Sequence, residues 1–270
     1  MSITSRMVRA LFKQGDDKRD AGLTTPEDIC RADDIAYGPD ETWQVLDVYR
    51  PKNAAGERLP VIVSVHGGGW VYGDKERYQF YCMSLAQRGF AVVNFTYRLA
   101  PEHKFPAPLE DTNLVFQWVL AHDEAYGFDK ERIFAVGDSA GAQILALYAC
   151  ICTDPDYASN YPFRPPEGFV PAAVALNCGV YQVEPTGKKD LTAKLMADYL
   201  PEKGSRKEHN LLNVLAHVNS RFPPAFIMTG TGDFLREAAP PMVDKLTALG
   251  VPVTYRLYGD DQNPLGHVFH

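Results

Sequence analysis

Short apolar segments rich in β-branched residues recur along the chain, with longer amphipathic segments between them. The apolar runs are short enough to be strands, and they read as strands buried on both faces. The expected strands are 45–49, 60–66, 91–97, 133–137, 172–176, 225–230 and 253–258. Helical spacing of apolar positions predicts helices near 78–88, 109–121, 141–152 and 241–249. This alternation predicts an α/β fold in which a mostly parallel central sheet is flanked by helices.

The segment 42–49 differs from the other expected strands because its apolar and polar residues alternate. Alternation is typical of a strand with one solvated face, so we expect an early antiparallel strand at the edge of the sheet. Two regions do not show the alternation of expected strands and helices, namely residues 1–35 and about 181–222. The second contains Pro185, Thr186 and Gly187 near its start, and we interpret both regions as candidate cap or lid segments. A solvated loop-and-helix insertion is the alternative for the second.

The length of 270 residues suits one α/β catalytic domain spanning 1–270. A formal charge of -7 without basic runs argues against nucleic-acid binding. The N-terminal region lacks the apolar core of a signal peptide, and no stretch reaches the length of a membrane span. Five scattered cysteines suggest reduced thiols, so a cytoplasmic location is expected. Cys150 and Cys152 lie too close together for the usual metal-binding spacing, and no metal site is predicted.

A nucleophile motif follows the expected strand 133–137. Gly137-Asp138-Ser139-Ala140-Gly141 matches the G-x-S-x-G pattern, in which the serine lies on a sharp turn between a strand and a helix. The flanking glycines suit a turn that brings backbones close together. We therefore predict Ser139 as a catalytic nucleophile.

A glycine-rich loop follows an earlier strand, with the sequence His66-Gly67-Gly68-Gly69-Trp70. Such a loop can point backbone N–H groups at the oxyanion of a tetrahedral intermediate. A phosphate-binding loop does not fit, because no Lys-Ser or Lys-Thr follows the glycines.

A serine nucleophile needs a base, and the base needs a carboxylate to orient it. Among the histidines after Ser139, His267 follows the last expected strand by one loop, whereas His209 and His217 lie in the candidate lid and His270 is terminal. We expect His270 to be unordered. Asp233 follows the strand 225–230 and is the preferred acid over Asp260 and Asp261. Asp233 could alternatively only cap the following helix.

These motifs together resemble the bacterial hormone-sensitive lipase-like carboxylesterases of the α/β-hydrolase fold. The segment from Tyr97 to Asp111, YRLAPEHKFPAPLED, is also similar to that family. The resemblance implies that backbone N–H groups of Gly68, Gly69 and Ala140 hold the oxyanion. It also implies that Gly67 shapes the turn and that Asp138 helps to fix the elbow.

The resemblance also implies a final helix after the catalytic histidine, whereas this sequence ends at His270. Apolar sheet surface could therefore be uncovered, and a homo-oligomer that covers it is one option.

The expected activity is hydrolysis of small carboxylic esters through an acyl-enzyme, with short acyl chains and no cofactor. Acetylated or aryl esters are candidate substrates, and Trp70, Tyr72 and Tyr181 could contact them or simply pack in the core. Two alternatives stay open. One is an arylformamidase-like or peptidase-like amide hydrolase with the same triad, and the other is a non-catalytic small-molecule receptor.

Overall fold

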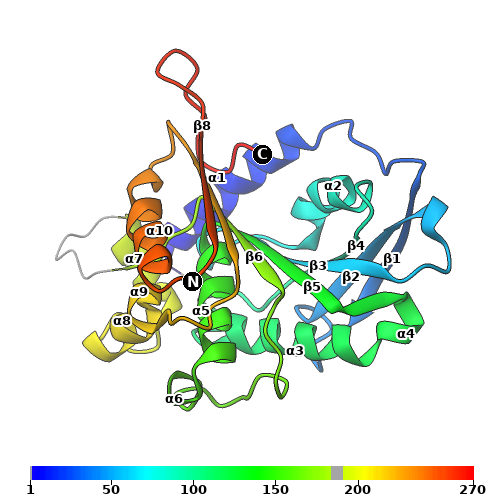
Figure 1. The fold of residues 1–270 in the computed structure, drawn as a ribbon. Coiled ribbons are helices and arrows are strands. Elements are labelled where there is room, and N and C mark those ends of the chain that lie inside the picture. Colours follow the sequence, from blue (N-terminus) through cyan, green and yellow to red (C-terminus); the bar gives the residue numbers. More distant parts are fainter. Residues whose placement is uncertain (1, 184–190) are drawn as a thin grey trace.

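The structure is a computed structural model that describes residues 2–183 and 191–270. An eight-stranded sheet runs through it in the order β1-β2-β4-β3-β5-β6-β7-β8 (Figure 1). The strands are β1 (Ile29–Ala36), β2 (Val45–Pro51), β3 (Leu59–Val65), β4 (Ala91–Phe95), β5 (Phe128–Asp138), β6 (Ala173–Asn177), β7 (Ala225–Gly230) and β8 (Val253–Tyr258). β2 pairs antiparallel with both β1 and β4, and the remaining neighbours pair in parallel. The prediction of a mostly parallel sheet is confirmed.

The four helices predicted from periodicity are present as α2 (Lys75–Ala86), α3 (Ala107–Ala121), α5 (Ala140–Thr153) and α10 (Ala239–Ala248). Further helices are α1 (Ile3–Arg19), α4 (Asp123–Tyr126), α6 (Pro155–Ala158), α7 (Leu191–Tyr199), α8 (Arg206–Leu212) and α9 (Val214–His217). The described residues also form two short 3₁₀ turns, η1 (Lys52–Ala54) and η2 (Arg236–Ala238).

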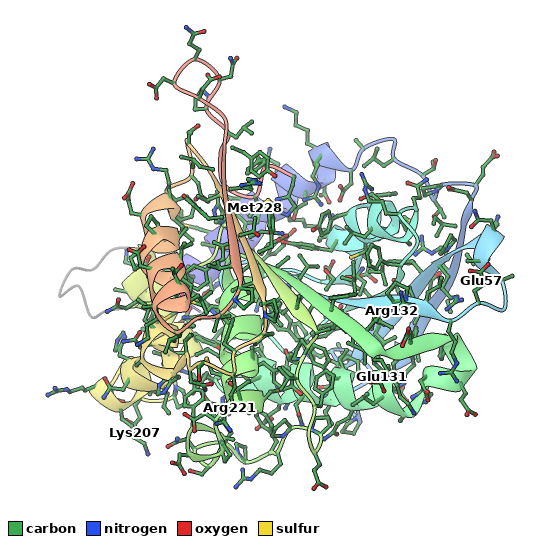
Figure 2. The ribbon with its side chains drawn as sticks, in the orientation of Figure 1. Glu57, Glu131, Arg132, Lys207, Arg221 and Met228 are labelled. Atoms are coloured by element: carbon green, nitrogen blue, oxygen red, sulfur yellow. The ribbon has the colours of Figure 1, made fainter. Side chains whose placement is uncertain are left out.

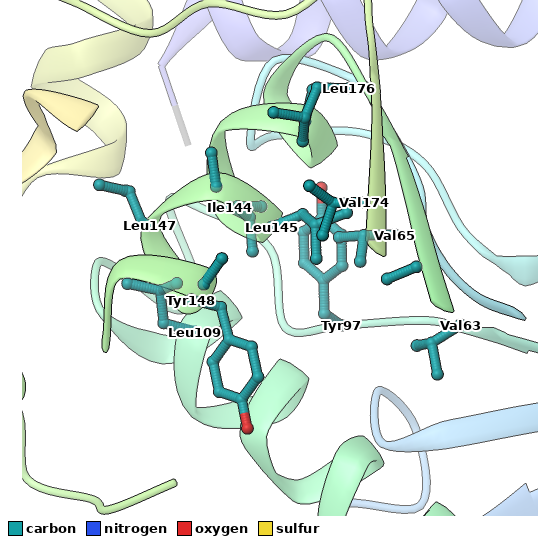
Figure 3. Close-up of a cluster of buried hydrophobic side chains, with 14 of the residues drawn as sticks. Val63, Val65, Tyr97, Leu109, Ile144, Leu145, Leu147, Tyr148, Val174 and Leu176 are labelled. Atoms are coloured by element: carbon teal, nitrogen blue, oxygen red, sulfur yellow. The ribbon is translucent and has the colours of Figure 1, made fainter. Parts of the chain in front are cut away.

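The main core lies between the sheet and the helices α3 and α5. Successive side chains of a strand point to opposite faces, so Val61, Val63 and Val65 of β3 join this core while Ile62 packs on the opposite side, near α2. Figure 3 shows Val63 and Val65 of β3 beside α5 side chains such as Leu145. Most charged side chains lie at the surface, among them Lys207 and Arg221, which are labelled in Figure 2, whereas a few such as Lys75 and Asp111 are buried. Among the described residues, no helix combines the length and apolar character needed to cross a bilayer.

The edge strand is not the one expected from the sequence. β2 is antiparallel as predicted, but β1 pairs along its other side, so β2 lies inside the sheet. The candidate cap 1–35 is therefore shorter than expected, because residues from Ile29 onward belong to the sheet. In the second candidate segment, the described part holds α7, α8 and α9, whereas Pro185, Thr186 and Gly187 lie outside the described residues.

An apolar groove marks the sheet face beside α2. It has a volume of about 550 Å³ and extends over β5 to β8. Its lining includes Ile62, Tyr81, Phe134, Val174, Phe226 and Val253. The expected uncovered apolar surface of the sheet is thus present in this structure.

Candidate active site

Ser139 lies at the junction between β5 and α5. Its φ of 52° and ψ of -113° are unusual for a residue other than glycine, as expected for a sharp turn between a strand and a helix. The backbone N–H of Ser139 donates to the carbonyl of Asn177 on β6 at 2.9 Å, which holds the turn against the neighbouring strand. The side chain is thereby presented at the carboxyl end of the sheet.

The two glycines of the motif allow close backbone contacts at this turn. A Cβ atom on Gly141 would lie 2.1 Å from the carbonyl oxygen of Val65, and one on Gly137 would lie 2.6 Å from the carbonyl oxygen of Gly141. Neither distance is compatible with a side chain, so both positions require glycine.

The glycine-rich loop after β3 lies directly beside the elbow. A Cβ atom on Gly67 would be 2.9 Å from the carbonyl oxygen of Asp138 and 3.5 Å from Cβ of Ser139. Gly68 and Gly69 have φ values of +116° and +61°. The backbone N–H groups of Gly68, Gly69 and Ala140 donate no hydrogen bond to any described residue. Three free donors therefore lie on the two backbone segments that meet at Ser139.

The buried side chain of His66 contacts this loop. Its ring stacks on Tyr97 with centroids 3.9 Å apart, and its Nδ1 lies 2.7 Å from the carbonyl oxygen of Gly67. Complete burial lowers the pKa of His66 to about 4. The imidazole is therefore neutral at pH 7 and can donate from Nδ1 to that carbonyl.

Asp233 and His267 contact each other across the carboxyl ends of β7 and β8. Nδ1 of His267 lies 2.8 Å from Oδ1 of Asp233. The other carboxylate oxygen accepts a hydrogen bond from the Thr229 hydroxyl at 2.9 Å, and the N–H of Leu235 donates to Oδ1 at 2.8 Å. The carboxylate can thus orient the imidazole while it is held by other donors.

The pKa of Asp233 is lowered despite its burial. Burial alone would raise this pKa, but the hydrogen bonds from Leu235, Cys178 and Thr229, together with the charge of His267, outweigh it. Asp233 therefore stays ionised at neutral pH, as a carboxylate that stabilises an imidazolium must.

Ser139 and His267 are not joined by a hydrogen bond within this structure. The hydroxyl of Ser139 donates to none of the described residues, and His267 bonds through Nδ1 to Asp233. Catalytic hydrogen bonds are often long without substrate and tighten in the bound complex. Asp233 and His267 are thus in contact, while the Ser139 hydroxyl is half-buried and unbonded.

The competing acids and histidines lie elsewhere. Asp260 caps its own loop by accepting from the N–H groups of Gln262 and Asn263, and Asp261 is exposed. His209 bonds to the carbonyl of Val183, and His217 stacks on Tyr157. These placements remove them from contact with Ser139 or His267.

His270 is not unordered, which corrects the expectation for this residue. Its Nε2 lies 3.1 Å from Oδ1 of Asp138, and the Nδ2 of Asn177 donates to the same oxygen at 3.0 Å. Asp138 is only 2% exposed, so its carboxylate needs these donors. The second His–Asp contact fastens the elbow to the loop that carries His267.

Two further neighbours of the imidazole were not found from the sequence. The sulfur of Cys178 lies within 4.8 Å of ligand atoms of Asp233 and His267. The ring of Phe234 is 4.4 Å from the His267 ring, although its side chain is 77% exposed. Only the position of Phe234 directly after Asp233 could have suggested the second contact.

Side chains of the candidate lid reach the glycine-rich loop. The position of a Cβ atom on Gly69 would be 3.4 Å from Cδ1 of Leu195 on α7. Trp70 stacks on Tyr199, also on α7, with centroids 5.3 Å apart. Trp70 and Tyr181 are 4% and 1% exposed, so both pack in the core. Tyr72 is partly buried, and its hydroxyl donates to Asp16.

The five cysteines are free thiols, in agreement with the expectation of reduced cysteines. Cys150 and Cys152 belong to the apolar helix α5, and burial raises the pKa of both thiols. Their role is packing.

Comparison with known proteins relates this chain to esterases of the alpha/beta hydrolase fold. Residues 62–270 match a family described as alpha/beta hydrolase fold. The chain is 32% identical over 243 residues to Carboxylesterase NlhH of Mycobacterium tuberculosis, which covers 86% of this chain and 75% of that protein. It is 33% identical to Esterase LipC of the same organism over 129 residues, which is 47% of this chain but only 32% of LipC.

Among solved structures, inhibited Esterase B from Lactobacillus rhamnosis superposes with a TM-score of 0.88 at 27% identity. The superposition covers 99% of this chain and 89% of that one. The resemblance noted from the motifs therefore holds over most of the sequence, and the chain belongs to the alpha/beta hydrolase fold family, close to the hormone-sensitive lipase-like carboxylesterases.

Proposed function

We propose that this protein is a serine-dependent carboxylic ester hydrolase that acts on small esters. The observation that carries the proposal is the group of unpaired backbone N–H donors, from Gly68, Gly69 and Ala140, on the two segments that meet at Ser139. Such donors are what an oxyanion requires and are otherwise costly to leave unpaired. The Asp233–His267 contact supplies the base and its orienting acid.

In the first half-reaction, the Ser139 hydroxyl attacks the ester carbonyl carbon while Nε2 of His267 accepts its proton. The negative charge moves to the carbonyl oxygen, where the three N–H groups stabilise it. Asp233 stabilises the imidazolium through Nδ1. Collapse of the tetrahedral intermediate breaks the bond to the alcohol, which leaves with the proton from His267.

In the second half-reaction, water attacks the acyl group on Ser139. His267 accepts a proton from that water and then returns it to the serine oxygen as the carboxylic acid leaves. No residue outside this group is needed for the proton transfers, and the mechanism uses no cofactor.

Short acyl chains are the proposed substrates. Leu195 of α7 faces Gly69 of the oxyanion loop, which narrows the space beside the reacting carbonyl. A related protein from Dothistroma septosporum, 29% identical over 223 residues, is named for an acetate ester, versiconal hemiacetal acetate. The relatives NlhH and LipC and the Dothistroma protein are all named as esterases, so hydrolysis of an amide is less favoured. A receptor role is also disfavoured because the complete set of catalytic side chains is present.

The cap segments and the cellular setting are part of the same proposal. We assign α1 and the helices α7 to α9 as the cap of a single domain. A cytoplasmic location is consistent with five free thiols. The apolar groove over β5 to β8 leaves room for self-association.

The test is Ser139→Ala, with Ser159→Ala as the matched control. Ser159 is an exposed serine whose hydroxyl bonds only the carbonyl of Asp156. We expect Ser139→Ala to lower kcat for p-nitrophenyl acetate by at least about 1000-fold with an unchanged circular dichroism spectrum, and Ser159→Ala to match wild type. Retained activity in Ser139→Ala would refute the assignment. Rates across acetyl, butyryl and octanoyl esters test the acyl preference, and a maximum for octanoate would contradict it.

A further inference from the structure

Helix α1 contacts the body of the protein through several polar side chains and through Val8, which is buried in the main core. The hydroxyls of Ser2, at its N-cap, and Ser5 both donate to Asp198 of α7. Nε of Arg9 donates to the carbonyl of Val71 at 2.6 Å, and Asp16 accepts from the Tyr72 hydroxyl at 2.7 Å. The inward face of this helix is thus held by hydrogen bonds and by the packing of Val8.

The opposite face of α1 is apolar and exposed. Ile3, Met7 and Leu11 are 73%, 59% and 61% exposed, and their spacing of four residues places them along one side of the helix. A surface helix normally turns such a stripe toward the core. Of the ten exposed large hydrophobic side chains in the described part of the chain, these three form the outer stripe of α1, whereas a fourth, Phe12 at 45%, packs its ring against Tyr72. This concentration distinguishes α1 from the singly scattered apolar residues that any surface carries.

The charge of α1 favours an anionic partner. The helix holds five basic and two acidic residues, a net charge of +3, in a chain with a formal charge of -7. The side chains of Arg6 and Lys18 form no hydrogen bond or ion pair with any described residue, so both remain available. A second copy of the chain would bring two helices of the same positive charge together. A basic amphipathic helix instead matches a negatively charged lipid surface.

The inward face of α1 contacts α7, the helix that borders the glycine-rich loop. Asp198, which α1 binds, lies on α7, and Leu195 of the same helix faces Gly69 in the glycine-rich loop. Figure 1 shows α1, in dark blue, as a continuous helix from the N-terminal end. The inward face of α1 is therefore linked through α7 to the glycine-rich loop.

We propose that Ile3, Met7 and Leu11 of α1 dock the protein onto anionic lipid surfaces, from which the site draws apolar esters. The choice of substrate rests on the proposed function, whereas the binding itself does not. The apolar side chains enter the boundary between head groups and acyl chains, and Arg6 and Lys18 contact the head groups.

The experiment is co-sedimentation of the full chain with phosphatidylcholine vesicles, prepared with or without phosphatidylglycerol. We expect Met7→Gln combined with Leu11→Gln to weaken binding to the anionic vesicles by about tenfold or more, because apolar burial drives interfacial binding. Glutamine keeps a helix propensity close to that of the residues it replaces. Val170→Gln combined with Leu257→Gln removes exposed apolar side chains elsewhere and serves as the matched control, with binding equal to wild type.

A charge variant separates the contribution of the basic side chains to vesicle binding from that of the apolar side chains. Arg6→Glu combined with Lys18→Glu should weaken binding only to vesicles that contain phosphatidylglycerol, and added salt should weaken wild-type binding in the same way. Hydrolysis of p-nitrophenyl acetate in solution should stay within about twofold of wild type in all these variants, because their side chains lie outside the site.

Three results would overturn the docking proposal. They are no binding of the wild type to anionic vesicles, equal binding of the Met7 and Leu11 variant, or a wild-type dimer in sedimentation velocity that this variant splits. The Ser139→Ala variant should bind vesicles as the wild type does. A protein that binds but never turns over ester contradicts only the proposed function, and an active protein that does not bind contradicts only the docking.

Discussion

Replacing Gly68 by alanine tests whether the glycine-rich loop holds the oxyanion. A Cβ atom at this position would lie 2.0 Å from the carbonyl oxygen of Tyr72 and 2.6 Å from its carbonyl carbon. Both atoms belong to the backbone, so no side-chain rotation can relieve the overlap. The φ of +116° is also one that alanine rarely adopts. The loop must therefore move, and the N–H of residue 68 moves with it.

The expected changes in kcat and in stability follow from the lost N–H donor and from the strain in the backbone. Losing one oxyanion donor typically lowers kcat about 100- to 1000-fold, which corresponds to about 3–4 kcal/mol of transition-state stabilisation. The backbone strain should separately lower the free energy of unfolding by about 1–3 kcal/mol. We expect the variant to stay folded but to show the full loss in kcat for p-nitrophenyl acetate.

Gly69→Ala is the matched control on the same loop. Gly69 has a φ of +61°, which alanine can adopt at a cost of about 1–2 kcal/mol, and the nearest atom to its Cβ is Cδ1 of Leu195 at 3.4 Å. That is the movable end of a flexible side chain, so the loop should stay in place and kcat should fall by no more than about tenfold. Steady-state kinetics and urea unfolding of both variants make the comparison. If Gly68→Ala kept kcat within about fivefold of wild type, the loop would not be the oxyanion site.

The other predictions concern two histidines outside the proposed triad. His66 is neutral in the folded protein, so between pH 6.5 and about 4 the unfolded chain binds a proton that the folded chain does not. Acidification over this range should lower the free energy of unfolding by about 3 kcal/mol. Urea unfolding of His66→Asn should therefore show a smaller pH dependence than that of the wild type. An equal pH dependence in the two proteins would contradict the neutral state of His66. His270→Ala removes one of the two side-chain donors to the buried Asp138 and should cost about 1–3 kcal/mol in stability, whereas His270→Gln can still donate and should recover most of it. Equal unfolding midpoints for all three proteins would show that the contact contributes nothing.

The central strands β3 and β4 were predictable because their side chains pack in hydrophobic clusters on both faces of the sheet. Their sequences are then nearly continuous apolar runs. The limits of β7 and β8 also match the expected ranges, although most of β8 is exposed. β5 is longer than its apolar run because its first half, which begins at Phe128, includes exposed charged residues. The exposed charged residues at the start of β5 therefore hid its beginning from the sequence analysis.

The two N-terminal elements gave no such signal. β1 pairs through its backbone with β2 on one side only, and most of its side chains are exposed or partly buried. α1 is attached mostly through Ser5, Arg9 and Asp16, and among its apolar side chains only Val8 is buried in the core. One buried apolar residue in seventeen leaves no apolar stripe that would mark the inward face of this helix in the sequence.

The sequence by itself determined the local parts of the candidate site. The glycine spacing around Ser139 and after His66 reflects backbone turns that leave no room for a Cβ, and a few adjacent residues suffice to specify such turns. Chain order then narrowed the acid and the base to a few candidates.

Only the tertiary structure decided which side chains meet. The separation of Asp233 and His267 by 34 positions is bridged by parallel pairing of β7 and β8, which brings their carboxyl ends together. The same packing brings His270 to Asp138 across 132 positions. Contacts of this kind depend on how strands are ordered in the sheet, and that order is set by the packing of the whole domain rather than by any local run of residues.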